Sequence, residues 1–472
     1  MLFNSVEFLC FLSTVFVLYW FVFNKNLKSQ NLLILVCSYV FYGWWDYRFL
    51  SLIFLSTIVD YIIGINIPKQ DSKKKQKLLL WCSVLFNLSV LGFFKYFNFF
   101  LESWVNLFNY VGYEFKSVWT LKIILPIGIS FYTFQTLSYT IDIYKKKIEP
   151  IRDFISFSSF VSFFPQLIAG PIERASNLLP QIINRREFKY EQGVQGLRLI
   201  LWGMFKKVVI ADSLAPTVDF IFSNYLDLEG GGLLLLGAIY FAFQIYCDFS
   251  GYSDIAIGTS KLFGFELMSN FKFPYFSRNI GEFWRRWHIS LSTWFRDYLY
   301  IPLGGSQEGK WKSIRNVFVI FLVSGFWHGA NWTFIFWGGF HAILFLPSFI
   351  FNTNRKYTSS IIAENTFLPS PKEFFQVGTT FILVTIGWVF FRSKTISDSL
   401  LYLNKMIFEF NIPNQLTSGI LYITSFLILD FFFRKNERLI LTSKSRRVMY
   451  LILTLSILYK FNSLNSFIYF QF

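Results

Sequence analysis

Long apolar runs, separated by short polar segments, follow one another along the chain as far as residue 461. A helix needs about 20 mainly apolar residues to cross a bilayer. By that criterion the chain contains roughly eleven to thirteen spans or re-entrant helices. The clearest lie at 2–23, 31–46, 49–67, 78–94, 121–144, 154–170, 194–211, 231–249, 317–328, 331–350, 376–392, 417–433 and 447–461. The pattern predicts an all-α polytopic membrane protein, in which residues 1–472 form a single membrane domain.

Basic residues gather in the segments between these runs, and the formal net charge is +16. In a soluble protein this excess would suggest nucleic acid. Here the charges follow the positive-inside rule, so we expect a bilayer and no nucleic-acid partner. The segments at 25–28, 69–77 and 144–147 would be cytoplasmic. Two spans separate each segment from the next, so the amino terminus is predicted to face outward. The first span has no basic flank and no cleavage site, and we expect it to be retained.

The four cysteines all lie in apolar runs and form no C-x-x-C pair. We expect them to act as small packing residues, in neither a disulfide nor a metal site. They are Cys10, Cys37, Cys82 and Cys247.

Polar side chains enter the apolar pattern mainly between residues 244 and 341. Charged groups inside a membrane are costly and usually functional. The stretch QIYCDFSGYSDIAIG places Asp248, Ser250 and Asp254 at the end of an apolar run. A glycine follows Ser250, so we expect the helix to break there. We favour capping or intramembrane ion pairing for the two carboxylates over a direct part in chemistry.

The next segment, NIGEFWRRWHISLSTWFRDYLYIPLGG at 279–305, has no long apolar run, yet its apolar residues recur with helical spacing. We expect an amphipathic helix along the membrane interface or inside a bundle. Arg285 and Arg286 would bind phosphate or anchor to lipid headgroups, and we favour anchoring. Composition alone favours a hydrogen-bonded structural histidine at His288.

A third polar stretch, FWHGANW at 326–332, places His328 at the end of the run 317–328. That run is too short to span a membrane alone, which indicates a broken or tilted helix. His341 lies about 220° away from His328 on one continuous helix, so the two are no i, i+4 metal pair. The chain has only three histidines, without a nearby cysteine or carboxylate set. We therefore expect no metal site and a structural His341.

A buried imidazole suits acyl transfer, which needs a base for the hydroxyl proton and an acid for the leaving thiol. Neutral imidazole does both near pH 7. Apolar burial keeps it neutral by lowering its pKa. His328 is the first candidate for this work, and His288 is the second. Spacing and composition do not establish that the two meet, and on those grounds a satisfied core histidine is the simpler interpretation of His328.

Several segments together resemble one family, the membrane-bound O-acyltransferases, and within it the bacterial branch that serves alginate O-acetylation. The resemblance extends over roughly residues 1–345. The matching segments are NLLILVCSYVFYGWWDYRFL, LPIGISFYTFQTLSYTIDIY, FPQLIAGPIERASNLLPQ, YCDFSGYSDIAIG, FWRRWHISLSTWFRDYLYIPLGG and FWHGANWTFIFWGGFHA. The last two are specific, because many rare residues match in order.

The resemblance implies a ring of tilted helices around a thinned centre. It implies that His328 is the catalytic histidine, as general base or acyl relay, and that His288 polarises the acyl carbonyl or orients the acceptor. Other side chains would line the site or a tunnel leading to it. They are Trp327, Asn331, Trp332, Trp287, Asp248, Ser250, Asp254, Arg285 and Arg286.

The implied function is O-acetylation of an exported polysaccharide, such as alginate or another cell-envelope polymer. The implied donor is a cytoplasmic thioester, either acetyl coenzyme A or an acyl carrier protein, and no bound cofactor is expected. The implied setting is the bacterial cytoplasmic membrane, with a periplasmic or cell-surface acetyltransferase as partner. Two alternatives stay open. One is an acyl conduit without chemistry of its own, and the other is a transferase for peptidoglycan O-acetylation or teichoic-acid D-alanylation.

Overall fold

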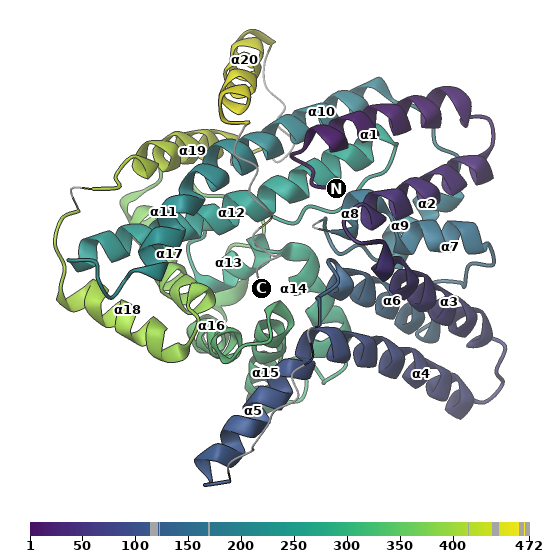
Figure 1. The fold of residues 1–472 in the computed structure, drawn as a ribbon, viewed down its shortest axis with the longest axis horizontal. Coiled ribbons are helices and arrows are strands. Elements are labelled where there is room, and N and C mark those ends of the chain that lie inside the picture. The colour runs from purple at the N-terminus through teal and green to yellow at the C-terminus, as the bar shows by residue number, and fades with distance from the viewer. Residues whose placement is uncertain are drawn as a thin grey trace. The chain divides into compact units, whose positions relative to one another are not determined.

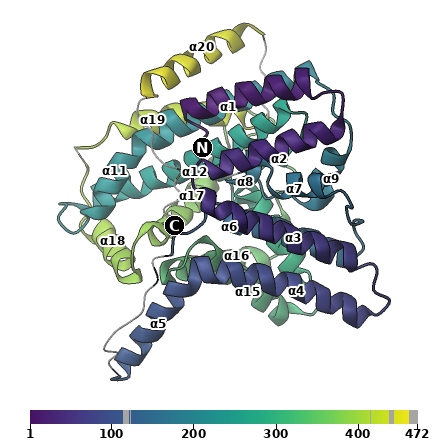
Figure 2. The ribbon, with the colours of Figure 1, turned by 45° about the vertical axis from the view of Figure 1, so that its right-hand side comes forward.

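The computed structural model describes residues 1–113, 121, 123–168, 170–413, 415–436, 443–461 and 467, without the side chains of 443–445. Within these residues all regular secondary structure is helical (Figures 1 and 2). The predicted all-α class is thereby confirmed.

Five helices of the described residues are long and apolar enough to cross a membrane: Tyr47–Asn66, Lys73–Tyr110, Gly231–Leu262, Trp332–Ile350 and Pro371–Arg392. Three shorter apolar helical segments, each made of one or two consecutive helices, are Val6–Val22, Phe154–Leu167 and Gly419–Phe433. Some apolar runs that looked like single spans are divided in the structure. The run 154–170, for example, forms two short helices with a non-helical turn between them. These helices are those of a multi-pass membrane protein.

The chain forms two compact units, and the prediction of a single domain stays a prediction. The first unit comprises residues 1–192 and 260–267, and the second comprises 193–259 and 268–472.

The first unit is a set of antiparallel and crossing helices. Its elements are α1 (Val6–Val17), the π-helix η1 (Leu18–Val22), α2 (Leu27–Gly43), the 3₁₀ turn η2 (Tyr47–Phe49), α3 (Leu50–Asn66), α4 (Lys73–Leu91), the π-helix η3 (Gly92–Tyr96), α5 (Phe97–Tyr110), α6 (Ile129–Tyr144), α7 (Phe154–Val161), α8 (Phe164–Leu167) and α9 (Ala175–Ile183).

A buried polar cluster joins α3, α4 and α6, which lie side by side in Figures 1 and 2. The carboxylate of Asp60, with none of its surface exposed, accepts hydrogen bonds from Ser83 at 2.5 Å and from Asn87 at 2.8 Å. Thr136 of α6 donates to the Asn87 side-chain oxygen at 3.2 Å. A buried polar group is tolerated when hydrogen bonds replace its water, so this cluster fixes how the three helices face one another.

The second unit contains the polar middle of the sequence. Its elements are α10 (Tyr190–Met204, which begins in the first unit), the π-helix η4 (Phe205–Ala211), α11 (Asp212–Ser223), α12 (Gly231–Leu262, which ends in the first unit), the 3₁₀ turn η5 (Pro274–Phe276), α13 (Ile280–Arg286), α14 (Ile289–Phe295), the π-helix η6 (Arg296–Tyr300), α15 (Lys310–His328), α16 (Trp332–Ile350), the 3₁₀ turn η7 (Thr353–Arg355), α17 (Pro371–Arg392), α18 (Ile396–Phe408), α19 (Gly419–Phe433) and α20 (Ser443–Lys460).

The helix break predicted after Ser250 is wrong, because α12 continues without interruption from Gly231 to Leu262. Gly251 serves close packing instead. A Cβ on Gly251 would lie 2.8 Å from the carbonyl oxygen of Gly203 in α10, and a Cβ on Gly203 would lie 2.5 Å from that of Gly251. Small residues let helix backbones approach closely in a membrane. These glycines therefore set the contact between α10 and α12.

Replacing Gly251 by leucine should force α10 and α12 apart and lower the free energy of unfolding by about 1–3 kcal/mol. The thermal unfolding midpoint in detergent micelles measures this loss. Gly378→Leu in α17 is the matched control, because a Cβ there meets nothing within 4 Å. Its midpoint should stay at that of the unchanged protein. Equal midpoints for the two variants would contradict the packing role.

Candidate functional site

His328 is the last residue of α15, at the tip of a tight helical hairpin. Gly329 is the C-cap of this helix, and Asn331 then caps α16 by accepting a hydrogen bond from the Thr333 amide at 3.0 Å. A Cβ on Gly325 would collide with the carbonyl oxygen of Phe334 across the hairpin. The run 317–328 is not broken, because α15 continues from Lys310 to His328, and the interruption lies after it at residues 329–331. This interruption places the imidazole where the two helices meet. Only 3% of the His328 surface is exposed.

His288 lies at a break in the chain between α13 and α14, where the sequence pattern had indicated one amphipathic helix. Its φ is 43°, in the left-handed region, which a non-glycine residue adopts at a cost. Two contacts to Asn270 hold it there. The Ile289 amide donates to the Asn270 carbonyl oxygen at 2.9 Å, and His288 Nδ1 lies 3.0 Å from Asn270 Oδ1. The break turns the imidazole inward, with 1% of the residue exposed.

The two histidines meet within the second unit, with ring centroids 6.4 Å apart. Trp327 lies 5.0 Å from His328 and 5.9 Å from His288. Trp337 of α16 lies 5.2 Å from His328, and Phe249 of α12 lies 4.7 Å from His288. The structure thus brings together two candidates that are forty residues apart in sequence, inside a shell of aromatic rings.

Burial decides the charge of His288. Loss of water around the ring lowers the pKa of its imidazole to about 3, so the ring is neutral at physiological pH. A neutral imidazole has one nitrogen that donates a hydrogen bond and one that accepts. The site therefore contains an uncharged imidazole, that of His288, in an apolar setting.

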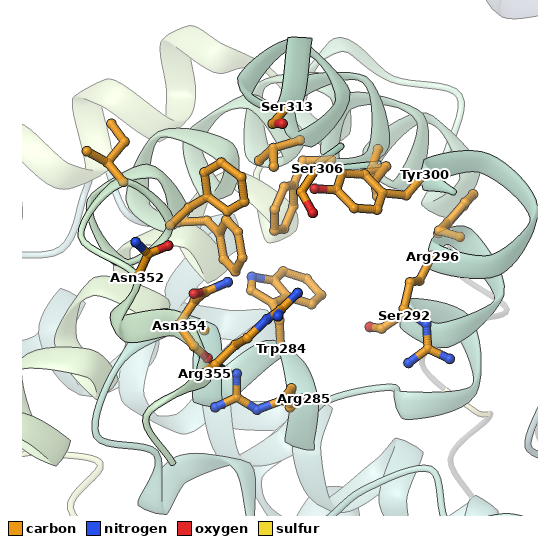
Figure 3. A pocket seen from close by; sticks show the side chains of 18 of the residues that line it. Trp284, Arg285, Ser292, Arg296, Tyr300, Ser306, Ser313, Asn352, Asn354 and Arg355 are labelled. Carbon is orange, nitrogen blue, oxygen red and sulfur yellow. Dashed lines mark hydrogen bonds between the residues drawn. The ribbon is translucent and has the colours of Figure 1, made fainter. Parts of the chain in front are cut away.

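A large cavity of about 860 Å³ lies beside this pair, formed by α13, α14, α15, α16 and the segments that connect them (Figure 3). Its lining includes Trp284, four residues before His288, and Ser324, four residues before His328. Four residues of an α-helix advance about 6 Å. The inner end of the cavity is therefore about one helical turn from His328 along α15.

The cavity is lined by more positive than negative charge. Its basic residues are Arg285, Arg296, Lys310 and Arg355. Arg296 pairs with Asp297 at 2.7 Å, whereas no carboxylate of the described residues forms an ion pair with the other three. Figure 3 shows the arginines around the cavity together with Trp284. Unpaired cations around a partly apolar cavity favour an anionic ligand with an apolar or polarisable part.

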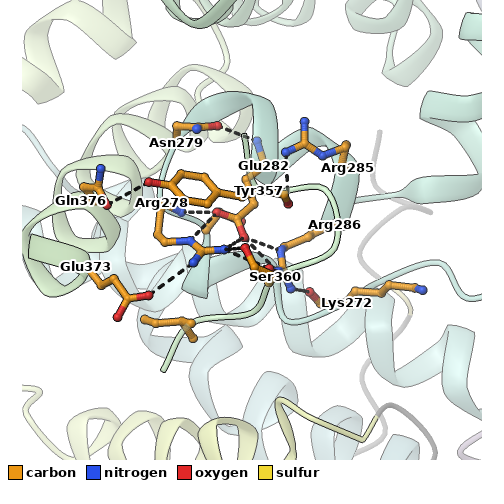
Figure 4. Close-up of polar contacts among 12 residues, drawn as sticks. Lys272, Arg278, Asn279, Glu282, Arg285, Arg286, Tyr357, Ser360, Glu373 and Gln376 are labelled. Atoms are coloured by element: carbon orange, nitrogen blue, oxygen red, sulfur yellow. Dashed lines mark hydrogen bonds and ion pairs between the residues drawn. The ribbon is translucent and has the colours of Figure 1, made fainter. Parts of the chain in front are cut away.

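The two arginines before His288 have different surroundings. Arg285 lines the cavity and donates to the backbone carbonyl oxygens of Asn354 and Tyr357. Arg286 instead belongs to a buried ion cluster (Figure 4). The carboxylate of Glu282, with none of its surface exposed, binds Arg286 at 2.8 Å and Arg278 at 3.0 Å. This cluster fixes the orientation of α13.

Asp248, Ser250 and Asp254 all face lysines of the π-helix η4. Lys207 bridges Asp248 at 2.7 Å and Asp212 at 2.8 Å. Lys206 pairs with Asp254 at 2.6 Å and donates to Ser250 at 2.9 Å. The structure therefore places the two carboxylates in buried ion pairs with lysines, one of the two roles favoured from the sequence, and Ser250 in a hydrogen bond with one of these lysines.

The remaining predicted lining residues are spread around the site. Trp287 is 1% exposed and stacks on Phe283, one helical turn before it. Asn331 donates to the Lys394 carbonyl oxygen at 2.9 Å, in addition to its capping bond. Trp332 is 55% exposed. Of the predicted lining residues, Trp327 contacts both histidine rings.

Three features of the site were not predicted from the sequence. They are the amide of Asn270, the rings of Trp337 and Phe391 around His328, and the basic cavity. His341 is fully buried and touches Trp337 at 4.9 Å, and its ring nitrogens have no hydrogen-bond partner in the described residues. Of the three unpredicted features, only the basic cavity had a signal in the sequence, because basic residues cluster at 310–315 and 355–356.

Comparisons with known proteins identify the family of this chain. The sequence profile of the membrane-bound O-acyltransferase family, MBOAT, matches residues 145–359 of this chain. A probable alginate O-acetylase, AlgI, of Pseudomonas syringae pv. tomato is 41% identical over 399 residues, 84% of this chain and 73% of that protein. The peptidoglycan O-acetyltransferase of Helicobacter pylori is 36% identical over 436 residues, 86% and 80% of the two chains. The teichoic acid D-alanyltransferase of Bacillus subtilis is 28% identical over 289 residues, 57% and 69%.

Replacing Glu282 by alanine should leave Arg278 and Arg286 without their shared carboxylate and destabilise the protein by about 3–5 kcal/mol. Thermal unfolding in detergent micelles measures the loss. Glu308→Ala is the control, because it removes one partner of an exposed pair with Lys312, which is worth less than about 1 kcal/mol. A Glu282 variant as stable as the Glu308 variant would show that the cluster does not hold α13.

Proposed function

Because the chain belongs to the membrane-bound O-acyltransferase family, and is an acyltransferase of the membrane, we propose that it moves acetyl groups from a cytoplasmic thioester to hydroxyl groups of an exported polysaccharide. The acceptor would be alginate or another polymer of the cell envelope. The relatives support this class of acceptor, since two of them are named for O-acetylation of alginate and of peptidoglycan.

The observation that carries the proposal is the position of the histidine pair beside the basic cavity. A thioester of coenzyme A or of a carrier protein ends in a long arm that begins at a phosphate. The three unpaired cations would bind the phosphate, and Trp284 would contact the arm. The thioester would then lie near Ser324, one helical turn from His328. In this proposal Arg285 binds phosphate, which is one of the two roles suggested from the sequence, and does not anchor the chain to lipid headgroups.

Charge also supports a cytoplasmic opening for the cavity. Near the cavity, the α15–α16 hairpin carries Lys310, Lys312 and Arg315 at its start and Arg355 and Lys356 just after its end. Its tip, GAN at 329–331, carries no charge. Lysine and arginine accumulate on the cytoplasmic side of membrane helices. The histidine pair would then lie deeper in the membrane, toward its outer side. We propose that this membrane is the cytoplasmic membrane of a bacterium and that the amino terminus of the chain faces outward.

The proposed reaction balances within the site. His328 takes the proton of the acceptor hydroxyl as the hydroxyl oxygen bonds to the acetyl carbon. The bond between that carbon and the thioester sulfur breaks, and His328 returns the proton to the sulfur. The aromatic shell keeps water from competing for the acetyl group. His288, whose ring lies next to that of His328, would contact the same substrates.

We extend the proposal to an exported partner, an acetyltransferase-like protein of the periplasm or cell surface that presents the polymer. In the described residues, the longest stretch between successive α-helices is 351–370. A separate folded domain needs roughly 50 residues or more. The chain described here therefore offers no domain of its own for holding a polymer.

His328→Ala should abolish acetyl transfer from acetyl coenzyme A to a simple alcohol by the purified protein, because the proton acceptor is lost. Loss of a general base alone costs about 10²–10⁴-fold in rate. Release of free coenzyme A measures turnover, and gel filtration in detergent checks folding. Turnover that persists in the variant, or that appears only when a partner protein supplies the nucleophile, would favour the acyl-conduit alternative.

Arg355→Glu should raise the KM for acetyl coenzyme A by about tenfold or more and change kcat little, because an exposed cation at the cavity becomes an anion facing phosphate. Lys356→Glu makes the same charge change at the neighbouring residue, which does not line the cavity. Its KM should rise much less. Similar KM values for the two variants would argue against a donor site in the cavity.

A further inference from the structure

Asn270 is built into the backbone break that presents His288. It is 1% exposed, and its carbonyl oxygen accepts the Ile289 amide at 2.9 Å. Two residues later, the Lys272 amide donates to the Arg286 carbonyl oxygen at 2.9 Å. The segment 270–272 thus runs alongside 286–289 and fixes the position of the His288 ring relative to the Asn270 side chain.

The orientation of the Asn270 amide follows from its neighbours. Its Oδ1 accepts the Ser290 hydroxyl at 2.9 Å and lies 3.4 Å from the Ser290 amide nitrogen, while its Nδ2 donates to the Ser253 hydroxyl at 3.1 Å. A flipped amide would set its own N–H groups against the Ser290 backbone N–H. The oxygen therefore faces His288, and an oxygen of this kind only accepts. The proton of the neutral His288 ring must then be on Nδ1, 3.0 Å away.

We infer that Asn270 is a positioning residue, which holds His288 in the tautomer protonated at Nδ1, and that His288 Nε2 receives a hydrogen bond from a second hydroxyl of the acceptor sugar, next to the hydroxyl that reacts. Nε2 is buried and has no hydrogen-bond partner in the described residues. A neutral ring whose only N–H is engaged by Asn270 has none left to donate. Of the two roles open to His288, it orients the acceptor and does not polarise the acyl carbonyl.

The second hydroxyl follows from the two imidazoles taken together, and this step rests on the proposed function. The reacting hydroxyl has one proton, which His328 takes. Its neighbour on the same sugar ring can donate to His288 Nε2, because the two imidazoles are adjacent, with ring centroids 6.4 Å apart, and this nitrogen has no hydrogen-bond partner in the described residues. No bond forms or breaks at His288. The site would therefore prefer an acceptor with two adjacent hydroxyl groups over one with a single hydroxyl.

The tautomer can be measured without any turnover. With three histidines in the chain, ¹⁵N-histidine labelling gives six ring-nitrogen signals, whose chemical shifts distinguish Nδ1–H from Nε2–H. His288→Phe assigns the pair of signals that disappears. We expect the Nδ1–H form in the otherwise unchanged protein, and a mixture or a change of form in Asn270→Ala. A dominant Nε2–H form would overturn the inference, whatever the outcome of the activity assays.

The acceptor preference is measured with acetyl coenzyme A and a matched pair of probes, cis-1,2-cyclohexanediol and cyclohexanol. The unchanged protein should have a KM for the diol about tenfold below that for the alcohol, as expected for one buried hydrogen bond. Asn270→Ala and His288→Phe should lose this preference by raising the KM for the diol alone. Ser253→Ala removes the hydroxyl that accepts from the amide nitrogen but leaves the contacts of Asn270 Oδ1 with Ser290 and His288 in place, so it should keep the preference.

An equal KM for the two probes in the unchanged protein would overturn the second-hydroxyl contact. So would a preference that survives in both the Asn270 and the His288 variants. Absence of turnover with either probe would count against the proposed function itself, and the nitrogen spectra would still decide the tautomer.

Discussion

The buried carboxylate of Glu282 stabilises the short helix that precedes His288. It binds two arginines that lie four residues to either side of it, and so stiffens the short helix α13. A seven-residue helix is marginal alone, and a left-handed residue at its end adds strain. The ion cluster and the backbone bonds to residues 270–272 compensate for both. The position of His288 therefore depends on ionic contacts outside the aromatic shell.

The second unit divides its polar groups into two kinds. Lysines and aspartates around α12 are paired with one another at 2.6–2.8 Å, as buried charges must be. The groups around the histidine pair are not satisfied in the same way. His288 Nε2, the indole N–H of Trp337 and both nitrogens of His341 have no hydrogen-bond partner in the described residues. Unsatisfied buried groups cost stability, and a bound substrate with its own donors would supply the missing partner of His288 Nε2.

The sequence predicted the helical class and the stretch that contains the site, because apolar periodicity and rare polar residues are local signals. His288 and His328 were selected through a family resemblance, and their meeting could not be derived from spacing. The prediction failed at Gly251, where a local breaker rule competed with a tertiary contact. Gly203 approaches Gly251 from another helix, and only that partner shows why the glycine is needed. The role of Asn270 was not predicted for the same reason. It depends on hydrogen bonds with Ser253 and Ser290, which are distant from Asn270 in the sequence and meet it only in the folded chain.

The hairpin of α15 and α16 connects the basic cavity with His328. Its open end carries the basic residues beside the cavity, and its tip carries His328. Glycines at 325 and 338 let the two helices pack so closely that a Cβ at either position would lie 2.2 Å from a backbone oxygen of the other helix. The distance from the cavity to the imidazole is therefore fixed by backbone packing. In the proposed function, a donor held by charge at one end would reach His328 only if its arm matches that length, so the hairpin would select donors by length as well as by charge.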